Sequence, residues 1–383
     1  LDSNKVVGCI LMDLSKAFDL IPHDLLIAKL SAYGFSLNAC AMINDYLSNR
    51  RQRVKIGIHT SDWLDVRSGV PQGSLTGPIL FNVFLNDLLT SMKDMCTIYN
   101  YADDNTLSFS HSDPNIVKNT LENAANFALH WFHDNHMKAN PTKFQALVLG
   151  RGGKGNGMVF RLSNGVTVEP SEHVTLLGMS LDKHLSFKHH VTELSKKCAK
   201  QVNVIARLSK HLNFECRLVL LNTFILSNLN YGAPIYHYCG VTDAKKLEVL
   251  QKRCVRHVLQ DFNSNYHEML SILKMPTLYQ RRLKNIIEFV FKILRNELPP
   301  VENIFTRQER RYDFRNDFML HIPRCLTVKY GTNSLRFNGA SLWNSLPNNI
   351  KCSDNASIFK RLSSAHDFTC NCRNCPLCSI NGI

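Results

Sequence analysis

The stretch that decides the fold of this chain is Val6–Asp13, VVGCILMD, which is apolar until it ends on a carboxylate. A continuous apolar run of this length, β-branched at its start, predicts a strand that is covered on both faces. Two further carboxylates, Asp103 and Asp104, lie in residues 98–109, which indicate two short strands bent at 102–105. We therefore expect carboxylates at the ends of adjacent strands of a buried sheet to lie close together.

Helical patterns flank these strands. Pro78 fits the first position of a helix that ends near residue 92, because a proline there loses no hydrogen bond that the helix needs. The other expected elements are a helix over 22–34, a helix that begins after residue 38, a helix over 115–136, a strand at 144–149, and a hairpin of residues 53–58 and 63–66.

Composition bounds the class of protein. The chain has 383 residues, of which 44% are hydrophobic, so it is too apolar for a disordered tail and long enough for two or three domains. Forty-five Lys and Arg against 31 Asp and Glu leave a net charge of +14, which favours a polyanion or an acidic membrane surface as partner. The sequence has no run of about 18 apolar residues, which argues against a transmembrane span. Thirteen cysteines, mostly scattered singly, and the lack of a signal peptide predict a reducing, intracellular compartment.

The chain changes character along its length. Residues 1–183 mix strands and helices, 184–275 are helical and rich in Lys and Arg, and 276–383 are rich in Asn, Arg and Pro. We expect these segments to be separate domains. The basic helical segment is expected to contact the phosphates of a nucleic-acid duplex, although Lys and Arg that only solvate helix faces give the same pattern.

Asp13, Asp103 and Asp104 carry the strongest chemical signal. Carboxylates that face each other across adjacent strands can hold two divalent cations about 3.5–4 Å apart, the arrangement used for in-line displacement at phosphorus. The alternative is that an Asp-Asp pair at a bend is ordinary turn chemistry, because Asp favours turns. The carboxylates alone leave both interpretations open.

The first half of the chain also carries five ordered motifs, which are residues 12–26 (MDLSKAFDLIPHDLL), 68–81 (SGVPQGSLTGPILF), 101–104 (YADD), 140–143 (NPTK) and 177–178 (LG). In order and spacing they resemble the motifs of reverse transcriptases of non-LTR retrotransposons. Residues 247–256 and 343–347 (WNSLP) resemble the tail of the jockey-like branch. Two positions depart from the pattern: Thr76 stands where an apolar residue is usual, and Asn105 where Thr is usual.

The resemblance implies an α+β fold. It places a polymerase palm, a ferredoxin-like antiparallel sheet backed by helices, at 1–183, with a residual fingers segment at about 50–67. An α-helical thumb follows at 184–275, and an irregular C-terminal region at 276–383. Because the family places fingers strands ahead of the first motif, while Asp13 is close to the first residue, we expect an N-terminally truncated fragment that does not synthesise DNA alone.

The resemblance also implies roles for single residues. Asp13 and Asp103 become the principal ligands of two Mg²⁺ ions, with Mn²⁺ as an alternative, and Asp104 completes the carboxylate cluster. Phe18 would lie under the incoming sugar and exclude a 2′-hydroxyl, unless it is an ordinary core aromatic. Gln72 would contact the incoming nucleotide, unless it is a solvated loop amide.

Two further assignments concern a lysine and the tail. Lys143 would donate a proton to the leaving pyrophosphate, unless it is a surface lysine that follows a proline turn. Four thiolates in the tail could close a tetrahedral zinc site, and an unstructured tail is the alternative. These cysteines are Cys370, Cys372, Cys375 and Cys378.

The implied activity is that of an RNA-directed DNA polymerase. It transfers nucleotides from deoxynucleoside triphosphates to the 3′-hydroxyl of a DNA primer or target DNA, on an RNA template. Target-primed insertion implies a nuclear location. Two alternatives stay open: a catalytically dead or domesticated nucleic-acid-binding remnant, and an intron-type maturase, against which SKAFD at 15–19 and WNSLP at 343–347 argue. The sequence indicates no membrane partner and no particular oligomeric state.

Overall fold

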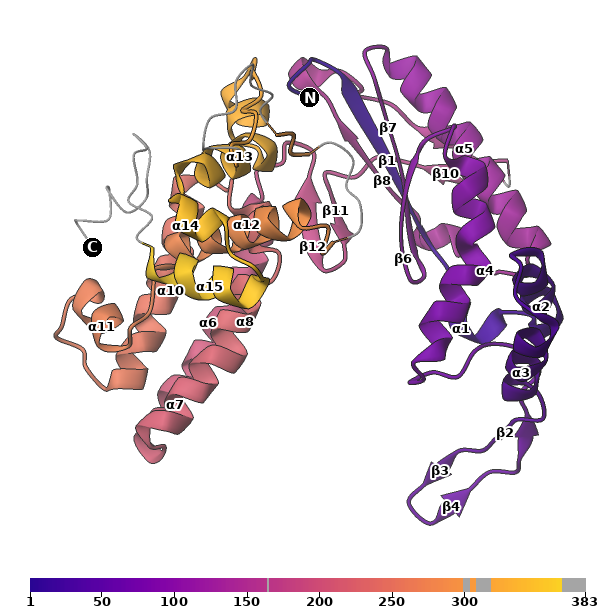
Figure 1. Ribbon diagram of the computed structural model, residues 1–383, viewed down its shortest axis with the longest axis horizontal. Coiled ribbons are helices and arrows are strands. Elements are labelled where there is room, and N and C mark those ends of the chain that lie inside the picture. The colour runs from indigo at the N-terminus through magenta and orange to yellow at the C-terminus, as the bar shows by residue number, and fades with distance from the viewer. Residues whose placement is uncertain (164, 299–303, 308–317, 367–383) are drawn as a thin grey trace. The chain divides into compact units, whose positions relative to one another are not determined.

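The computed structural model covers residues 1–383 and describes all of them except 164, 299–303, 308–317 and 367–383. The described residues form two compact units (Figure 1). The first holds Leu1 and residues 3–177, and the second holds Asp2 and residues 178–383. The finer division into palm, thumb and C-terminal region stays a prediction.

The first unit is built on a four-stranded antiparallel sheet. The strand order is β6 (Thr97–Tyr101), β7 (Asp104–His111), β1 (Val6–Asp13) and β8 (Gln145–Leu149). β1 lies between two partners, with Val6 opposite His111 and Val7 opposite Leu149. Alternate residues of β1 are buried and the others are half-buried, so both of its faces are covered, one of them completely. The expected strands at the start of the chain and around residues 98–109 are confirmed.

Helix α5 (Pro114–Asp134) packs against this sheet at Gly8. A Cβ atom at Gly8 would lie 2.6 Å from Leu121 Cδ1 and 2.8 Å from Val117 Cγ1. The glycine therefore lets the helix approach β1 more closely than any other residue would. Asp113 caps α5, because its side chain accepts a hydrogen bond from the backbone N–H of Asn115.

Helix α4 (Thr76–Met92) begins two residues before the expected start at Pro78. The earlier start has a local cause: the Ser74 hydroxyl accepts a 2.9 Å hydrogen bond from the backbone N–H of Gly77, which satisfies a free donor of the first turn. The unit is completed by α1 (Ala17–Leu20), α2 (His23–Ala32), α3 (Leu37–Leu47), η1 (Pro141–Lys143), η2 (Arg151–Gly153), β9 (Phe160–Arg161), β10 (Thr167–Val168) and β11 (His173–Leu176).

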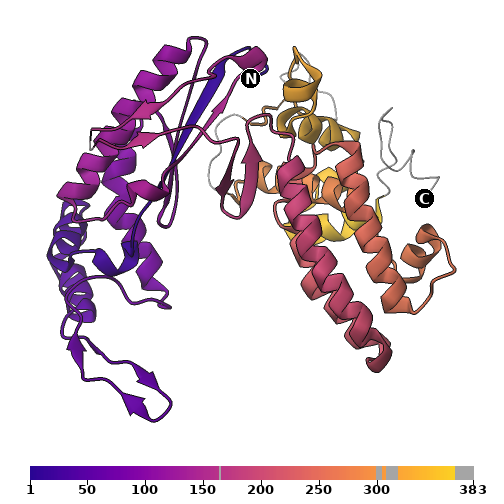
Figure 2. The same cartoon turned by 180° about the vertical axis from the view of Figure 1, so that it is seen from behind.

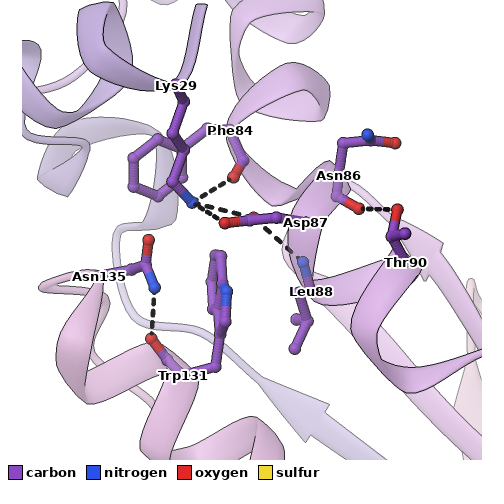
Figure 3. A network of polar contacts seen from close by, with 8 residues as sticks. All are labelled: Lys29, Phe84, Asn86, Asp87, Leu88, Thr90, Trp131 and Asn135. Atoms are coloured by element: carbon purple, nitrogen blue, oxygen red, sulfur yellow. Dashed lines mark hydrogen bonds and ion pairs between the residues drawn. The ribbon is translucent and has the colours of Figure 1, made fainter. Parts of the chain in front are cut away.

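A half-buried ion pair ties three helices of the first unit together (Figure 3). Lys29 of α2 donates to the Asp87 carboxylate of α4 at 2.8 Å and to the Phe84 carbonyl at 2.9 Å. Its ammonium lies 4.3 Å from the ring centre of Phe84 and 4.4 Å from that of Trp131 on α5. Burial lowers the pKa of Lys29, and the Asp87 carboxylate opposes that shift.

Residues 51–65 form a hairpin, as expected, but its tip at residues 57–58 lies inside the expected strand 53–58. β2 (Arg51–Gln52) pairs with β5 (Leu64–Asp65), and β3 (Lys55–Ile56) pairs with β4 (His59–Thr60). All these strand residues are exposed. Figure 1 shows the hairpin extending beyond α2 and α3.

The second unit is mostly helical. Helices α6 (Lys188–Leu208) and α10 (Val241–Leu259) lie side by side (Figure 1 and Figure 2) and share a core with Tyr236. A second core surrounds α12 (Leu278–Leu294). The remaining elements are β12 (Met179–Asp182), η3 (Ser209–His211), α7 (Phe214–Leu220), η4 (Leu221–Leu226), α8 (Ser227–Asn230), α9 (Ala233–Tyr236), α11 (Tyr266–Ile272), η5 (Val328–Thr332), α13 (Leu335–Ser345), α14 (Asn348–Lys351) and α15 (Ala356–Ala365).

The expectation of an irregular region at 276–383 is wrong for its described part. Helices α12 to α15 occupy much of it and surround a core that includes Trp343 and Phe359. Polar side chains begin three of these helices: Thr277, Ser334 and Asn355 each accept a hydrogen bond from a backbone N–H of the first turn.

None of the helices in the described part of the chain is long and apolar enough to cross a membrane.

Candidate active site

Asp13 and Asp104 are directly opposed across the sheet. Asp13 is the last residue of β1, Asp104 is the first of β7, and the two are partners in the strand register. Directly opposed residues of an antiparallel pair have their side chains on the same face, with Cβ atoms about 4.5–5.5 Å apart. The predicted meeting of carboxylates at a sheet edge is thus present for this pair.

The two aspartates line a pocket of about 330 Å³, which we call the carboxylate pocket. Lys143 lines it as well, together with residues from β1, β7 and the start of β8. Asp103 lies in the turn between β6 and β7, outside the set of residues that line this pocket. The structure therefore brings two of the three predicted carboxylates to the pocket wall.

The turn that carries Asp103 is fixed by two asparagines. Asn105 is only 2% exposed, and its side-chain carbonyl accepts a 2.6 Å hydrogen bond from the Asn100 amide. Its own amide donates to the Asp103 carbonyl at 3.1 Å. Ala102 has a φ of +53°, a left-handed conformation that alanine rarely adopts. Asn105, which departs from the family pattern, is therefore part of the support of the turn, and its partner Asn100 was missed in the sequence.

The carboxylates at these strand ends interact electrostatically. Burial raises the pKa of Asp104, and the neighbouring Asp103 and Asp13 carboxylates raise it further. Repulsion among like charges therefore disfavours ionised Asp104, and a bound cation would relieve that repulsion. These residues offer only oxygen donors, which are the ligands that hard divalent cations prefer.

Lys143 already supplies one positive charge here. Its ammonium lies 3.1 Å from Asp13 Oδ2, with the lysine side chain 64% exposed and that of Asp13 29% exposed. In the described part of the chain, no group of three or more His, Cys, Asp or Glu side chains is arranged to hold a metal ion. The oxygen atoms of these side chains are chemically suitable ligands for a divalent cation. The three predicted carboxylates, however, do not surround one common point.

The backbone at 138–143 places Lys143. The Ser15 N–H donates to the Lys138 carbonyl at 2.8 Å, and the Asn140 N–H donates to the Asp13 carbonyl at 3.0 Å. These bonds continue the end of β1 into the short η1 turn. Lys143 is therefore positioned by main-chain pairing with the strand end that carries Asp13.

Gln72 and Phe18 belong to a second group of residues, built around α1, which itself contains Phe18. The Gln72 amide donates to the Asp19 carboxylate at 2.9 Å, and the Phe18 ring stacks on Phe81 with centroids 4.4 Å apart. Neither residue is among those that line the carboxylate pocket. Phe18 is half-buried and Gln72 is exposed, so the structure leaves their nucleotide-contacting roles as predictions.

Gly69 connects the loop that carries Gln72 to the segment around α1. Its N–H donates to the Ile21 carbonyl, and the next N–H, of Val70, donates to the Phe18 carbonyl, both at 2.8 Å. Gly69 has a φ of +83°, and a Cβ there would lie 2.6 Å from Asp19 Cα, so only glycine fits. Gly69 and Asp19 both lie within the motifs quoted above, but their sequence positions alone did not indicate these roles.

The predicted zinc ligands of the tail, Cys370, Cys372, Cys375 and Cys378, lie outside the described residues. The cysteines of the described part, from Cys9 to Cys352, are free thiols.

Several known proteins are similar to this chain. Residues 2–181 match the family model described as reverse transcriptase (RNA-dependent DNA polymerase). Over 258 residues the chain is 25% identical to the RNA-directed DNA polymerase from mobile element jockey of Drosophila melanogaster, covering 64% of this chain and 28% of that protein. Over 272 residues it is 25% identical to the probable RNA-directed DNA polymerase from transposon BS of the same species, covering 67% and 29%. The chain thus spans less than a third of the length of these relatives.

Solved structures of Candida tropicalis telomerase are more distant. The apo enzyme is 11% identical, with a TM-score of 0.38 over 73% of this chain and 45% of that chain. Telomerase in complex with a fragment of telomeric RNA is 13% identical, with a TM-score of 0.35 over 70% and 49%. These scores are too low to define a shared fold.

Proposed function

We propose that this chain, whose residues 2–181 are a reverse transcriptase domain related to those of non-LTR retrotransposons, is the catalytic part of an RNA-directed DNA polymerase. The reaction would join a deoxynucleoside triphosphate to a primer 3′-hydroxyl on an RNA template and release pyrophosphate. The observation that carries this proposal is the direct pairing of Asp13 with Asp104, two aspartates that the family's first and third motifs supply.

Asp13, Asp103 and Asp104 would hold the divalent ions that reverse transcriptases use, with Mg²⁺ as the proposed metal. When bound, such ions lower the pKa of an attacking hydroxyl and stabilise the charge on the leaving group. The mutual repulsion that raises the pKa of Asp104 supports this assignment, because it makes the site favourable for cations.

Lys143 would change partners during this reaction. In the structure its ammonium neutralises Asp13. With the carboxylate charge otherwise compensated, the ammonium would be free to donate a proton to the oxygen of the departing pyrophosphate. Its high exposure leaves the side chain room to reorient.

Phe18 and Gln72 would act on the nucleotide. The ring of Phe18 is held in one orientation by stacking on the fully buried Phe81, so it can serve as a rigid wall below a sugar. Gln72 would exchange its bond to Asp19 for one to the nucleotide. Steric exclusion of a 2′-hydroxyl by Phe18 would select deoxynucleotides.

The helical second unit would grip the template–primer duplex as a thumb. Exposed cations on α6 and α10, such as Lys196, Lys200 and Arg253, suit contacts with phosphates. The partners would then be an RNA template and a DNA primer or target DNA. Target-primed insertion would place the protein in the nucleus.

RNA-templated primer extension tests the proposed function. We would compare the chain alone with a chimera that carries, ahead of it, the part of the jockey polymerase that precedes the matched region. The chimera should extend a primer in the presence of Mg²⁺, and Asp103→Asn in the same chimera should abolish extension. A folded chimera that binds the duplex without extending it would favour a catalytically dead remnant.

A further inference from the structure

The second unit contains a pocket of about 290 Å³ whose charged lining residues are all basic, which we call the basic pocket. Arg295 follows α12, Arg307 pairs its backbone with Leu320, and Lys351 ends α14. Phe318 and Trp343 complete its wall. Three cations from three separate segments of the chain thus meet at one cavity.

The WNSLP motif at residues 343–347 builds this wall. The Asn344 side chain accepts a hydrogen bond from the Leu320 N–H and donates one to the Leu320 carbonyl, both at 2.8 Å. The Trp343 indole N–H donates to the Phe318 carbonyl at 2.6 Å. The motif therefore fixes the segment that carries Phe318 and Leu320, a task that the proposed polymerase chemistry does not require.

Among the described residues, Arg295 and Lys351 have only neutral partners, and Arg307 has no side-chain partner. Lys351 is 4% exposed, and its ammonium donates to the Asn344 carbonyl at 3.1 Å and lies 3.7 Å from Met319 Sδ. Arg295 donates to the Ser353 carbonyl, and its guanidinium lies 5.5 Å from the ring centre of Phe291. No ion pair joins Arg295, Arg307 or Lys351 to a carboxylate within the described part of the chain.

Cations gathered without a counter-charge among the described residues favour an anion strongly. Burial lowers the pKa of Lys351, which reflects the cost of removing its ammonium from water. An anion in the pocket would offset that cost. Guanidinium groups match the oxygens of phosphate in geometry, and two of the three cations here are arginines.

We propose that the basic pocket binds a phosphate group of a nucleic-acid strand. Phe318, 38% exposed at the wall, would offer a ring for an adjacent base, the combination of stacking and phosphate contact that single strands use. The net charge of +14 favours such a polyanion over a small free anion. This site goes beyond the proposed function, because it requires none of the aspartates of the carboxylate pocket.

Fluorescence anisotropy with labelled single-stranded DNA tests the proposal. Arg307→Gln removes one charge from the pocket, and its side chain makes no hydrogen bond to another described residue that would be lost. Arg361→Gln on α15 is the matched control, because Arg361 is exposed and does not line the pocket. We expect Arg307→Gln to weaken binding about fivefold in 0.1 M salt and to reduce the salt slope by about 0.7, with Arg361→Gln close to the unmutated chain.

A second variant separates stacking from charge. Phe318→Leu keeps an apolar side chain and should weaken binding while leaving the salt slope unchanged. Thermal melting of each variant checks that it is folded. Asp103→Asn should not change binding of single-stranded DNA at the basic pocket. A negative result for polymerase activity can therefore be distinguished from a negative result for this site.

Three outcomes would overturn the inference. One is an equal effect of Arg307→Gln and Arg361→Gln on affinity and salt slope. Another is an affinity that neither Arg307→Gln nor Phe318→Leu changes. The third is an Arg307-dependent site that inorganic phosphate occupies while single-stranded DNA does not, which would make it a site for a free anion.

Discussion

The carboxylate pocket and the basic pocket are similar in size, about 330 and 290 Å³, and opposite in charge. The first presents paired aspartates whose repulsion is relieved in part by Lys143. The second presents Arg295, Arg307 and Lys351, and no carboxylate pairs with them among the residues described. A phosphate can bind directly to the second pocket, whereas the first needs cations before it can accept one. The two pockets would therefore bind phosphate groups in different ways, the first through bound cations and the second through its own basic side chains.

The largest effect is expected from a substitution among the proposed metal ligands. Asp103→Asn in the chimera should lower primer extension more than tenfold, because a metal ligand loses its charge while packing is unchanged. Duplex affinity and melting temperature should stay close to those of the unmutated protein. Extension above about a tenth of the original rate would remove Asp103 from the proposed ligand set.

Phe18→Ala should admit ribonucleotides. Loss of the ring opens space at the sugar, and we expect discrimination against ribonucleotides to fall roughly tenfold in the chimera. Phe81→Leu is the control, because it removes the stacking partner and keeps the Phe18 ring. If both variants lose stability and neither changes selectivity, Phe18 is an ordinary core aromatic.

The Lys29–Asp87 pair shows how a buried cation behaves when its counter-charge is present, and so sharpens the comparison with Lys351. Asp87→Asn should lower the free energy of unfolding by about 1–3 kcal/mol, because Lys29, 11% exposed, keeps its charge without a carboxylate. Asp65→Asn breaks the exposed Arg51–Asp65 pair, and should cost about 1 kcal/mol or less. If urea unfolding shows that Asp87→Asn and Asp65→Asn lower the free energy of unfolding equally, this account of the effect of burial is wrong.

The smallest expected effect is a pH dependence at Asp104. Its pKa is raised in the folded protein, so the folded state binds a proton more tightly than the unfolded chain does. That contribution to stability is present below the ordinary carboxyl pKa and is lost as the pH rises through the folded pKa. Asp104→Asn should therefore raise the melting temperature of the metal-free protein slightly at pH 7, by roughly 1 °C, and not at low pH.

Added Mg²⁺ gives the complementary measurement. It should raise the melting temperature of the unmutated chain at pH 7 and have less effect on Asp104→Asn, because only a site with its full negative charge gains from the cation. A melting temperature of Asp104→Asn that is lower than that of the unmutated protein at every pH would show that Asp104 stabilises the fold by other contacts.

Much of the first unit could be predicted because its elements depend on local pattern. The apolar run of β1 and the bend between β6 and β7 predicted their strands, and the motif order predicted the reverse transcriptase family. The expectation of an irregular C-terminal region rested on its content of Asn, Arg and Pro, whereas Asn355, like Thr277 and Ser334, caps a helix there. A cap and a loop have the same composition, and only the hydrogen bond to the following turn distinguishes them.

The sequence by itself determined the strands, the identity of the aspartates and the excess of positive charge. Only the tertiary structure decided which charges meet. It pairs Asp13 with Asp104, places Lys143 on Asp13, and gathers Arg295, Arg307 and Lys351 from separate segments around one cavity. The physical reason is that strand and helix patterns follow from neighbours in the chain, whereas electrostatic interactions depend on distance in space, which packing of remote segments sets.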